Sequence, residues 1–514
     1  METLGLMIQQ KIDVHGRFLY HWRCEETRLF QLSFADDLLL FCQADETSIR
    51  IFKEGLDDFS SLSGIHTNAA KSQALFSKAA QPFKNTIISI LGFQEGPLPV
   101  NTLDFHLLPR SSPSMIAHPL LIKIDKRLQG WASIRLSFAA RIQLIKSVLM
   151  SLQIYWAMAF ILPKGVIKEI EKRFRQFLWK GESSLGYPKV SWNQVCRPLE
   201  EGGQGIMDVG ALNPTLMSRH IWRIVSKSPS SIWVTWICTM RLQGKSSWIV
   251  EANSGSWGSL VSYGILLTIF PHGPYHTHTR ADMLLREVIH NGIWHWPQFL
   301  TSTHTRGDVI MLNIIHNLPP IQGTNDSITL RGGPYTNRRV YDIFRSSGPK
   351  VDWYSLLMGP FKIPRNSFIL WPALQKRLST MDRTWLQQLN SDCVLCSLDT
   401  LETHQHLLFS CHYSKQCIRI LYRKVRFSWT NRGWMIDGMV VARKWRGKHV
   451  VNASYRNLLA SLVYHIWQEP NRRKFQQLDR EPSALANIIL DEIRLRILSE
   501  ELPNTISTIA LYRL

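Results

Sequence analysis

The chain has 514 residues, 45% of them hydrophobic, which is enough to bury the cores of roughly two to four domains. It carries 60 Lys and Arg against 39 Asp and Glu, so its net charge of +21 favours polyanionic partners such as nucleic acid or an anionic membrane. This composition excludes a disordered tail, and eight cysteines are too few for a disulfide framework in a chain of this size.

The opening residues contain neither a basic region nor a long apolar core, so they do not predict a signal peptide. The longest apolar run, 152–162, is about half the ~20 residues that a membrane-spanning helix requires. We therefore expect no membrane segment, and an intracellular protein of the nucleus or cytoplasm that is not secreted.

Residues 28–42 form two short apolar runs that meet at a polar dipeptide, which predicts a buried β-hairpin with Asp36 and Asp37 at its turn. Residues 47–61 should form an amphipathic helix on that hairpin, because apolar residues recur there at helical spacing: Ile49, Phe52, Leu56 and Phe59. Adjacent carboxylates at a hairpin tip can hold Mg²⁺ or Mn²⁺ for phosphoryl transfer. A solvated turn is the other interpretation, and the pair Asp57-Asp58 shows how weak such a signal is alone.

From about 115 to 180 the pattern changes to helices with three apolar stripes, which are Leu120, Ile124, Leu128 and Trp131, then Ile142, Ile145, Leu149 and Leu152, then Ile167, Ile170, Phe174 and Phe177. Basic side chains lie between them, with Lys126, Arg127, Arg141 and Lys146 as candidate nucleic-acid contacts. A plain solvated face is the alternative, and a membrane-surface helix lacks the strong apolar face it would need.

The glycines Gly202, Gly203 and Gly205 predict a loop, and residues 206–345 show no period from which elements can be placed. Further along, Leu458, Leu462 and Ile466 indicate a helix that ends in the basic run 471–474.

Three cysteines and a histidine lie close together as Cys393-x₂-Cys396 and His406-x₄-Cys411. Three thiolates and an imidazole suit a closed tetrahedral site for structural zinc, with no position left for a catalytic water. Buried free cysteines are the alternative, and three neighbours could replace a ligand: His404, His412 and Cys417.

The motif Phe34-Ala35-Asp36-Asp37 and the following segment 59–72 resemble the polymerase palm of reverse transcriptases from plant non-LTR retrotransposons. This resemblance implies that Asp36 is a metal ligand, that Asp37 is its neighbour in the motif, and that Lys71 lies near the phosphates of the incoming nucleotide. The likeness continues through 136–149, 177–179 and 201–206. The chain departs from the family at 102–105, where a Tyr-Leu-Gly turn normally grips the primer.

A second likeness covers Ser367-Phe368, Trp371, the Cys/His cluster, Tyr464-His465-Ile466-Trp467 and 471–475, which are similar to the zinc-binding domain that follows such polymerases. Together the likenesses imply an α+β architecture made of several parts. They are a partial palm with a hairpin and helices (1–110), a helical basic thumb (111–200), an undefined linker region (201–345), a mostly helical zinc-binding domain (346–480) and a C-terminal tail (481–514).

The resemblance implies an RNA-directed DNA polymerase with structural Zn²⁺ and catalytic Mg²⁺ or Mn²⁺. Its expected partners are RNA and RNA–DNA hybrid, and also upstream reverse transcriptase segments or an endonuclease domain. Because only Asp13 precedes Asp36, and in a stretch unlike the earlier palm strand, we expect a truncated copy without fingers that is inactive as an isolated chain. The alternatives are a non-catalytic zinc-containing nucleic-acid-binding protein and a zinc-stabilised interaction protein.

Overall fold

A computed structural model describes 2–34, 37–96, 100–102, 105–107, 113–132, 134, 136–180, 188–226, 231–242, 289–290, 293–294, 334–359, 361–383, 392–396, 399–425, 442–447 and 449–498. Over these residues the chain is mostly helical with four two-stranded sheets, which agrees with the α+β expectation. It forms two compact units, the first from 1–116 and 214–343 and the second from 117–213 and 344–514. The predicted thumb and zinc-binding segments therefore share one unit.

The predicted hairpin is present in the first unit. Strand β1 (Gln31–Phe34) pairs antiparallel with β2 (Asp37–Leu40), and Phe34 lies opposite Asp37. The expectation that the hairpin is buried is wrong, since Phe34 is 66% exposed. Leu38 and Leu40 of β2 pack against the core of this unit, while Phe34 does not belong to that core.

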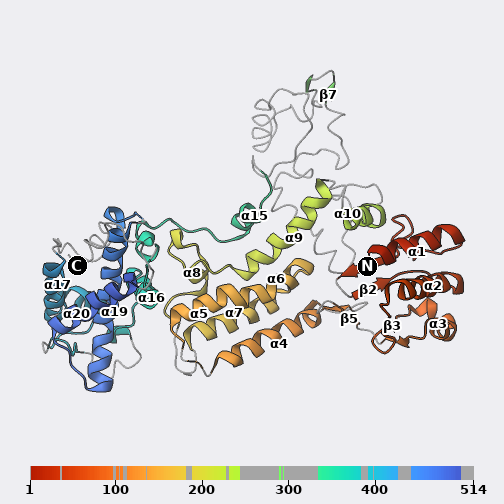
Figure 1. Ribbon diagram of the computed structural model, residues 1–514. Coiled ribbons are helices and arrows are strands. Elements are labelled where there is room, and N and C mark those ends of the chain that lie inside the picture. The colour runs from red at the N-terminus through yellow and green to blue at the C-terminus, as the bar shows by residue number, and fades with distance from the viewer. Residues whose placement is uncertain are drawn as a thin grey trace. The chain divides into compact units, whose positions relative to one another are not determined.

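Helices α1 (Glu2–His15) and α2 (Glu46–Ser63) pack against each other beside the hairpin (Figure 1). Helix α2 confirms the prediction for 47–61, and Asp45 caps it by accepting a 2.9 Å hydrogen bond from the Ser48 backbone N–H. Helix α1 was not predicted. The two helices approach closely at Gly55, where a Cβ atom would lie 2.7 Å from the Ile8 side chain. The shared core contains Leu4, Ile8, Ile12, Phe18, Phe30, Ile51, Phe52 and Leu56.

The other elements that lie wholly in the first unit are short. They are β3 (Gln73–Ala74) paired in parallel with β4 (Gln94–Glu95), η1 (Lys78–Phe83), α3 (Lys84–Leu91), the hairpin of β5 (Val100–Thr102) and β6 (Phe105–Leu107), α10 (Ile232–Ile237), η4 (Cys238–Leu242), and the pair β7 (Ile289–His290) and β8 (Ile293–Trp294). Helices α4 (Pro113–Ala132), α9 (Val209–Val225) and α15 (Asn337–Phe344) continue from one unit into the other along the chain.

The first part of the second unit is a set of helices: α5 (Phe138–Leu144), the π-helical turn η2 (Ile145–Leu149), α6 (Met150–Ala159), α7 (Lys164–Trp179), α8 (Trp192–Cys196) and η3 (Leu199–Glu201). The predicted apolar stripes form its core, and their most buried members have no exposed surface: Leu120, Ile124, Ile145, Leu149, Ile170 and Phe174. Polar contacts join the helices, since Arg173 pairs with Asp125 at 2.7 Å and Arg141 donates to the Leu178 carbonyl at 3.2 Å.

The predicted glycine loop follows η3, with Gly202 and Gly205 at φ of 77° and 67°. The loop is fixed to the C-terminal part of the same unit, because the Trp371 indole N–H donates to the Gly202 carbonyl at 2.8 Å. A side chain at Gly203 is impossible without movement, since its Cβ would lie 1.9 Å from the Arg197 carbonyl oxygen.

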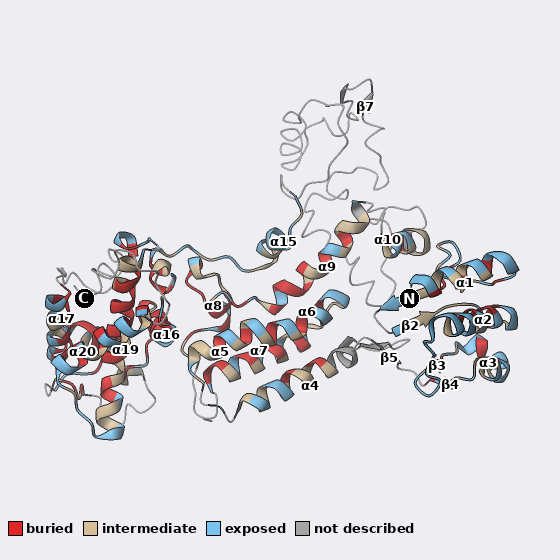
Figure 2. Ribbon diagram, in the orientation of Figure 1, coloured by how far each residue is buried: buried red, intermediate tan, exposed pale blue. Residues whose placement is uncertain are grey.

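The C-terminal part contains η7 (Asp352–Leu357), α16 (Pro364–Leu374), η8 (Met381–Arg383), the π-helical turn η9 (His406–Ser410), α17 (His412–Lys424), α19 (Val450–Gln476) and α20 (Pro482–Leu498). Helix α16 is buried from Asn366 to Leu374 and packs on α19 (Figure 2). Residues assigned from the sequence to a tail form α20, whose buried Leu485, Ile489 and Ile493 help it to pack on α17 and α19.

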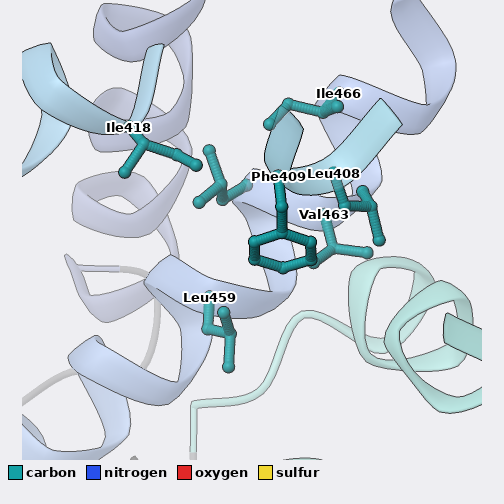
Figure 3. Close-up of a pocket in the computed structure, with 7 residues that line it drawn as sticks. Leu408, Phe409, Ile418, Leu459, Val463 and Ile466 are labelled. Atoms are coloured by element: carbon teal, nitrogen blue, oxygen red, sulfur yellow. The ribbon is translucent and has the colours of Figure 1, made fainter. Parts of the chain in front are cut away.

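The interior between η9, α17 and α19 is tightly packed (Figure 3). Leu408 and Phe409 meet Ile418, Leu459 and other apolar side chains around a cavity of about 10 Å³. That volume is about one water molecule, so this space is a packing defect and offers no room for an organic ligand.

Within the residues that the structure describes, one helical stretch, Phe138–Ala159, has the length and apolar composition of a membrane span, and 39% of its most apolar window is buried. The core helix of a soluble protein meets the same criterion. Ile145, Leu149 and Trp156 of this stretch are in the interior of the second unit.

Candidate metal centre

The structure brings together the four side chains that the sequence nominated as zinc ligands. The ligand atoms of Cys393, Cys396, His406 and Cys411 all lie within 4.8 Å of one another. The sulfurs of Cys393 and Cys411 are 4.0 Å apart, and the Cys396 sulfur is 3.3 Å from His406 Nε2. Over the described part of the chain, this is the one cluster of at least three potential metal ligands.

Local backbone contacts set each ligand in place. Residues Asp392 and Leu401 form an antiparallel bridge, and the Cys393 N–H donates to the Thr400 carbonyl at 2.8 Å, so the chain folds back on itself at Cys396. The His406 N–H donates to the Thr403 hydroxyl at 3.0 Å, which fixes the start of η9.

Cys411 stands at the N-terminus of α17, where free backbone N–H groups favour a negative charge. Cys393 shares a hydrogen bond with it, and this contact, together with the N–H groups of Ser414 and Tyr413, lowers the pKa of Cys411. The same contact and burial raise the pKa of Cys393. One thiolate is therefore already favoured in the metal-free cluster, and zinc would replace the remaining protons.

The three alternative ligands do not belong to the cluster. The Nε2 atom of His404 lies 3.0 Å from the Ala373 carbonyl oxygen of α16, and this histidine is buried. His412 is exposed on the first turn of α17. Burial raises the pKa of the Cys417 thiol to about 12, so it stays protonated beside Tyr413.

The dimensions of the cluster fit zinc. Zn–S bonds of about 2.3 Å and Zn–N bonds of about 2.0 Å separate tetrahedral ligand atoms by about 3.3–3.8 Å. The Cys393–Cys411 sulfur separation of 4.0 Å and the separation of 3.3 Å between the Cys396 sulfur and His406 Nε2 lie near that range. Four protein ligands would close the coordination shell, so a bound zinc would stabilise the fold and would leave no open position for catalysis.

A residue that the sequence analysis did not single out braces this cluster. Arg473 of α19 donates to the Val394 carbonyl, between Cys393 and Cys396, at 3.3 Å. Its guanidinium also lies 4.8 Å from the Tyr413 ring and 3.5 Å from the buried carboxylate of Glu469. The basic run 471–474 was visible in the sequence, but nothing in it distinguished Arg473 from its neighbours.

A partly buried polar network holds α20 in the same unit. The Glu492 carboxylate receives hydrogen bonds from Arg365, from Asn366 at 2.8 Å and from His465 at 3.2 Å. Burial alone would raise the pKa of Glu492, but the hydrogen bonds from His465, Arg365 and Asn366 outweigh it and lower the pKa to about 2. Glu492 was not predicted, because its partners are distant in sequence.

The structure describes two of the three predicted polymerase residues, Asp37 and Lys71. Asp36 lies outside the described residues, and Asp37 is exposed at the first position of β2. Lys71 is exposed in a turn whose N–H donates to Asn68, and no hydrogen bond or ion pair joins it to Asp37 in the described chain. The comparison pair Asp57 and Asp58 forms ordinary surface ion pairs with Lys53 and Lys11.

The four candidate nucleic-acid contacts differ in environment. Lys126 and Arg127 are exposed on α4, and neither has an ion-pair partner within the described ranges. Arg141 is partly buried, with its guanidinium 5.4 Å from the Phe138 ring. Lys146 is also partly buried, and burial followed by the charge of Lys362 lowers its pKa.

Residues 335–417 match a family described as zinc-binding in reverse transcriptase. This part of the chain is therefore similar to the zinc-binding segment of reverse transcriptases. The match contains all four residues of the cluster, so the resemblance of this segment to the zinc-binding domain is confirmed, and a structural zinc ion is supported by both the family and the geometry.

Two proteins of Arabidopsis thaliana are similar to parts of the chain. One, named "putative ribonuclease H protein", is 31% identical over 149 residues, which cover 27% of this chain and 23% of that protein. The other, an uncharacterized mitochondrial protein, is 30% identical over 78 residues, which cover 15% of this chain and 51% of that protein. The chain thus spans about a quarter and about half of the lengths of these relatives.

Proposed function

We propose that this retrotransposon-derived chain binds RNA or RNA–DNA hybrid as part of an RNA-directed DNA polymerase, with its zinc site serving to hold the binding surface together. The observation that carries the proposal is the Cys/His cluster of the reverse-transcriptase zinc-binding segment, which lies in one compact unit with the basic helices. A zinc ion would order the segment, and the helices would contact the phosphates.

Charge distribution supports this function. No acidic residue occurs between Asp125 and Glu169, while Lys126, Arg127 and Lys146 fall in that stretch. Each phosphate contact releases counterions, so affinity should fall steeply with added salt. Arg173 is a less suitable contact, because it is already paired with Asp125 and Glu169.

Binding can be tested with fluorescent RNA and RNA–DNA hybrid over a range of salt concentrations. Reversing the charge of Lys126, Arg127 and Lys146 together should weaken binding to all sequences. The slope of log affinity against log salt concentration should fall by about the amount that three phosphate contacts contribute. A matched control reverses Lys53, Lys84 and Arg50, which form ion pairs in the first unit. Equal affinity of the triple variant and the wild type would exclude these helices as the binding site.

The polymerase part of the proposal concerns the hairpin. Asp36 and Asp37 would supply carboxylates for divalent ions, and Lys71 would face the nucleotide phosphates, as the resemblance implies. In a complete site of this kind, two metal ions assist the primer 3′-hydroxyl in displacing pyrophosphate from a nucleotide triphosphate.

The second candidate is a zinc-containing nucleic-acid-binding protein without catalysis. The exposure of Asp37 and Phe34 favours it, because catalytic metal ligands need surroundings that exclude water and fix geometry. Primer extension on an RNA template with Mg²⁺ or Mn²⁺ separates the two candidates. Extension that disappears in an Asp36→Ala, Asp37→Ala variant would establish the polymerase, while binding without extension would favour the second candidate.

A further inference from the structure

Helix α17 carries a line of exposed polar side chains along its length. The buried side chains of this helix are Tyr413, Ser414, Cys417, Leu421 and Tyr422. Four exposed residues recur at intervals of four, three and four: His412, Gln416, Arg419 and Arg423. These intervals place the four residues along one line of the helix surface, opposite the buried side. With a rise of 1.5 Å per residue, this α17 stripe is about 16 Å long.

The α17 stripe has no free acidic neighbour in the elements that pack on its helix. No Asp or Glu occurs in 403–436, a range that contains both α17 and the packed turn η9. Helix α20 also packs on α17, and its two acidic residues are Asp491 and Glu492. They are already paired with Arg494 and Arg365 respectively. The positive charge of the stripe is therefore not balanced by these elements.

Other surface helices of the chain balance their cations within the helix. Lys53 pairs with Asp57 one turn along α2 at 2.8 Å, and similar pairs occur on α7 and α20. On α17 the residue one turn after Arg419 is Arg423, and neither has an ion-pair partner among the described residues. Like charges four residues apart disfavour a helix. A cation in the last turn suits the helix dipole, which accounts for Arg423 but not for Arg419.

Contacts at both ends hold α17 in place. Its N-cap residue is Cys411, one of the four residues of the Cys/His cluster. The Ser414 hydroxyl donates to the Leu407 carbonyl at 2.6 Å, and at the other end Lys424 donates to the Asn487 side chain of α20 at 2.6 Å. A helix fixed in this way presents the side chains of its exposed stripe at constant spacing.

The stripe suits an extended polyanion. Guanidinium groups donate two parallel hydrogen bonds to phosphate, and glutamine side chains also contact nucleic-acid backbones. Phosphates recur about every 3.4 Å of axis along each strand of a duplex, so a stripe of about 16 Å can contact more than one of them. An anionic membrane would require apolar side chains beside the cations, and the four residues of the stripe include none.

We propose that Arg419 and Arg423, with Gln416 beside them, bind phosphates in the backbone of RNA or RNA–DNA hybrid. The inference rests on the proposed function and adds a second contact region, on the helix that the Cys/His cluster anchors. A bound zinc ion would then support binding, because its ligand Cys411 fixes the first turn of the helix that carries the arginines.

The test measures binding of fluorescent RNA–DNA hybrid to the full chain over a salt series. An Arg419→Gln, Arg423→Gln double variant should bind several-fold more weakly, and its slope of log affinity against log salt concentration should be smaller by about two. The matched control is Arg50→Gln, Lys53→Gln, which removes the same charge from ion pairs on α2 and should bind as the wild type does. Replacing both arginines of the stripe with lysine keeps the charge and should keep the slope.

A measurement without nucleic acid shows whether the arginines serve the fold instead. The Tm of the glutamine double variant should lie within about 2 °C of the wild-type value, because exposed side chains without partners contribute little to stability. A clearly lower Tm would overturn the inference. Loss of binding to phosphatidylserine vesicles with unchanged binding to the hybrid would also overturn it, in favour of a membrane contact.

The binding results separate this inference from the proposed function. If the wild type binds the hybrid and the glutamine double variant binds it equally well, or if the α2 control loses as much affinity, the α17 stripe alone is overturned. A wild-type chain that binds neither RNA nor the hybrid would overturn the proposed function as well.

Discussion

The Cys/His cluster and the hairpin carboxylates are both polar sites on short turns, yet the chain supports them very differently. The cluster is braced by neighbouring helices, with Arg473 of α19 on one side and α17 behind Cys411. The hairpin is packed on one face only, and Phe34 beside its turn is 66% exposed. A site whose geometry is fixed from several directions can bind a metal tightly, and a site supported from one direction depends on whatever covers its other face.

The largest expected effect is loss of the zinc site. We expect purified protein to contain close to one zinc per chain, and Cys396→Ser to lose most of it and to destabilise the second unit by more than about 4 kcal/mol. Metal analysis and thermal melting measure the two changes. Cys417→Ser is the control, because this buried cysteine on α17 lies outside the cluster. A Cys396→Ser protein with full zinc and unchanged melting would exclude the assignment.

The next effect concerns the network that holds α20. The pKa of Glu492 is about 2 in the folded chain against an ordinary value of 4.5, so its ionised form stabilises the fold above pH 4.5. This contribution is lost as the pH falls towards 2. Glu492→Gln should lower the free energy of unfolding by about 3 kcal/mol at neutral pH. The variant should then lose less stability than the wild type as the pH falls from 4.5 towards 2.

The matched control for Glu492 is its neighbour Asp491, an exposed residue that pairs with Arg494 at 3.3 Å. Asp491→Asn should change stability by less than about 0.5 kcal/mol. If both variants melt alike between pH 3 and 7, the Glu492 network does not contribute to stability as argued.

These two sites also show what could be predicted from the sequence. The zinc cluster was predictable because its four ligands fall within one short segment and their spacing is characteristic. The spacing nominated His406 but left His404 as a substitute, and the contact of His404 with the Ala373 carbonyl of α16 decides between them. Glu492 was placed in a tail because its partner Asn366 lies 126 residues away, and no local pattern reports such a contact.

For the hairpin, the sequence predicted the strands correctly and their burial wrongly. Two apolar runs around a polar pair correctly predicted two paired strands, because local alternation and turn residues determine pairing. Burial was predicted wrongly, since the same pattern does not say which faces other elements cover. Helix α1 was missed although Leu4, Ile8 and Ile12 recur at helical spacing, a signal that was present in the sequence.

A smaller effect on zinc affinity is expected from Arg473, which contacts the cluster from α19. Arg473→Met should weaken zinc binding by about tenfold, because residues that hold metal ligands in place typically contribute that much. Competition with a zinc chelator measures the change. Arg472→Met, in the same basic run, is the control and should retain wild-type affinity. If the two variants lose zinc equally, the contact from Arg473 to Val394 does not position the cluster.

The smallest expected effect belongs to the hairpin. Phe34→Ser should change stability by no more than about 0.5 kcal/mol, because an exposed side chain loses little contact when it is shortened. Phe52→Ala, in the buried core below the same hairpin, should cost about 3–5 kcal/mol. Chemical denaturation of the full chain, followed by a probe in the first unit, compares the two. A large loss for Phe34→Ser would mean that another part of the chain covers the outer face of the hairpin. In that case Asp37 would be enclosed as the zinc ligands are, and the contrast between the two sites would fail.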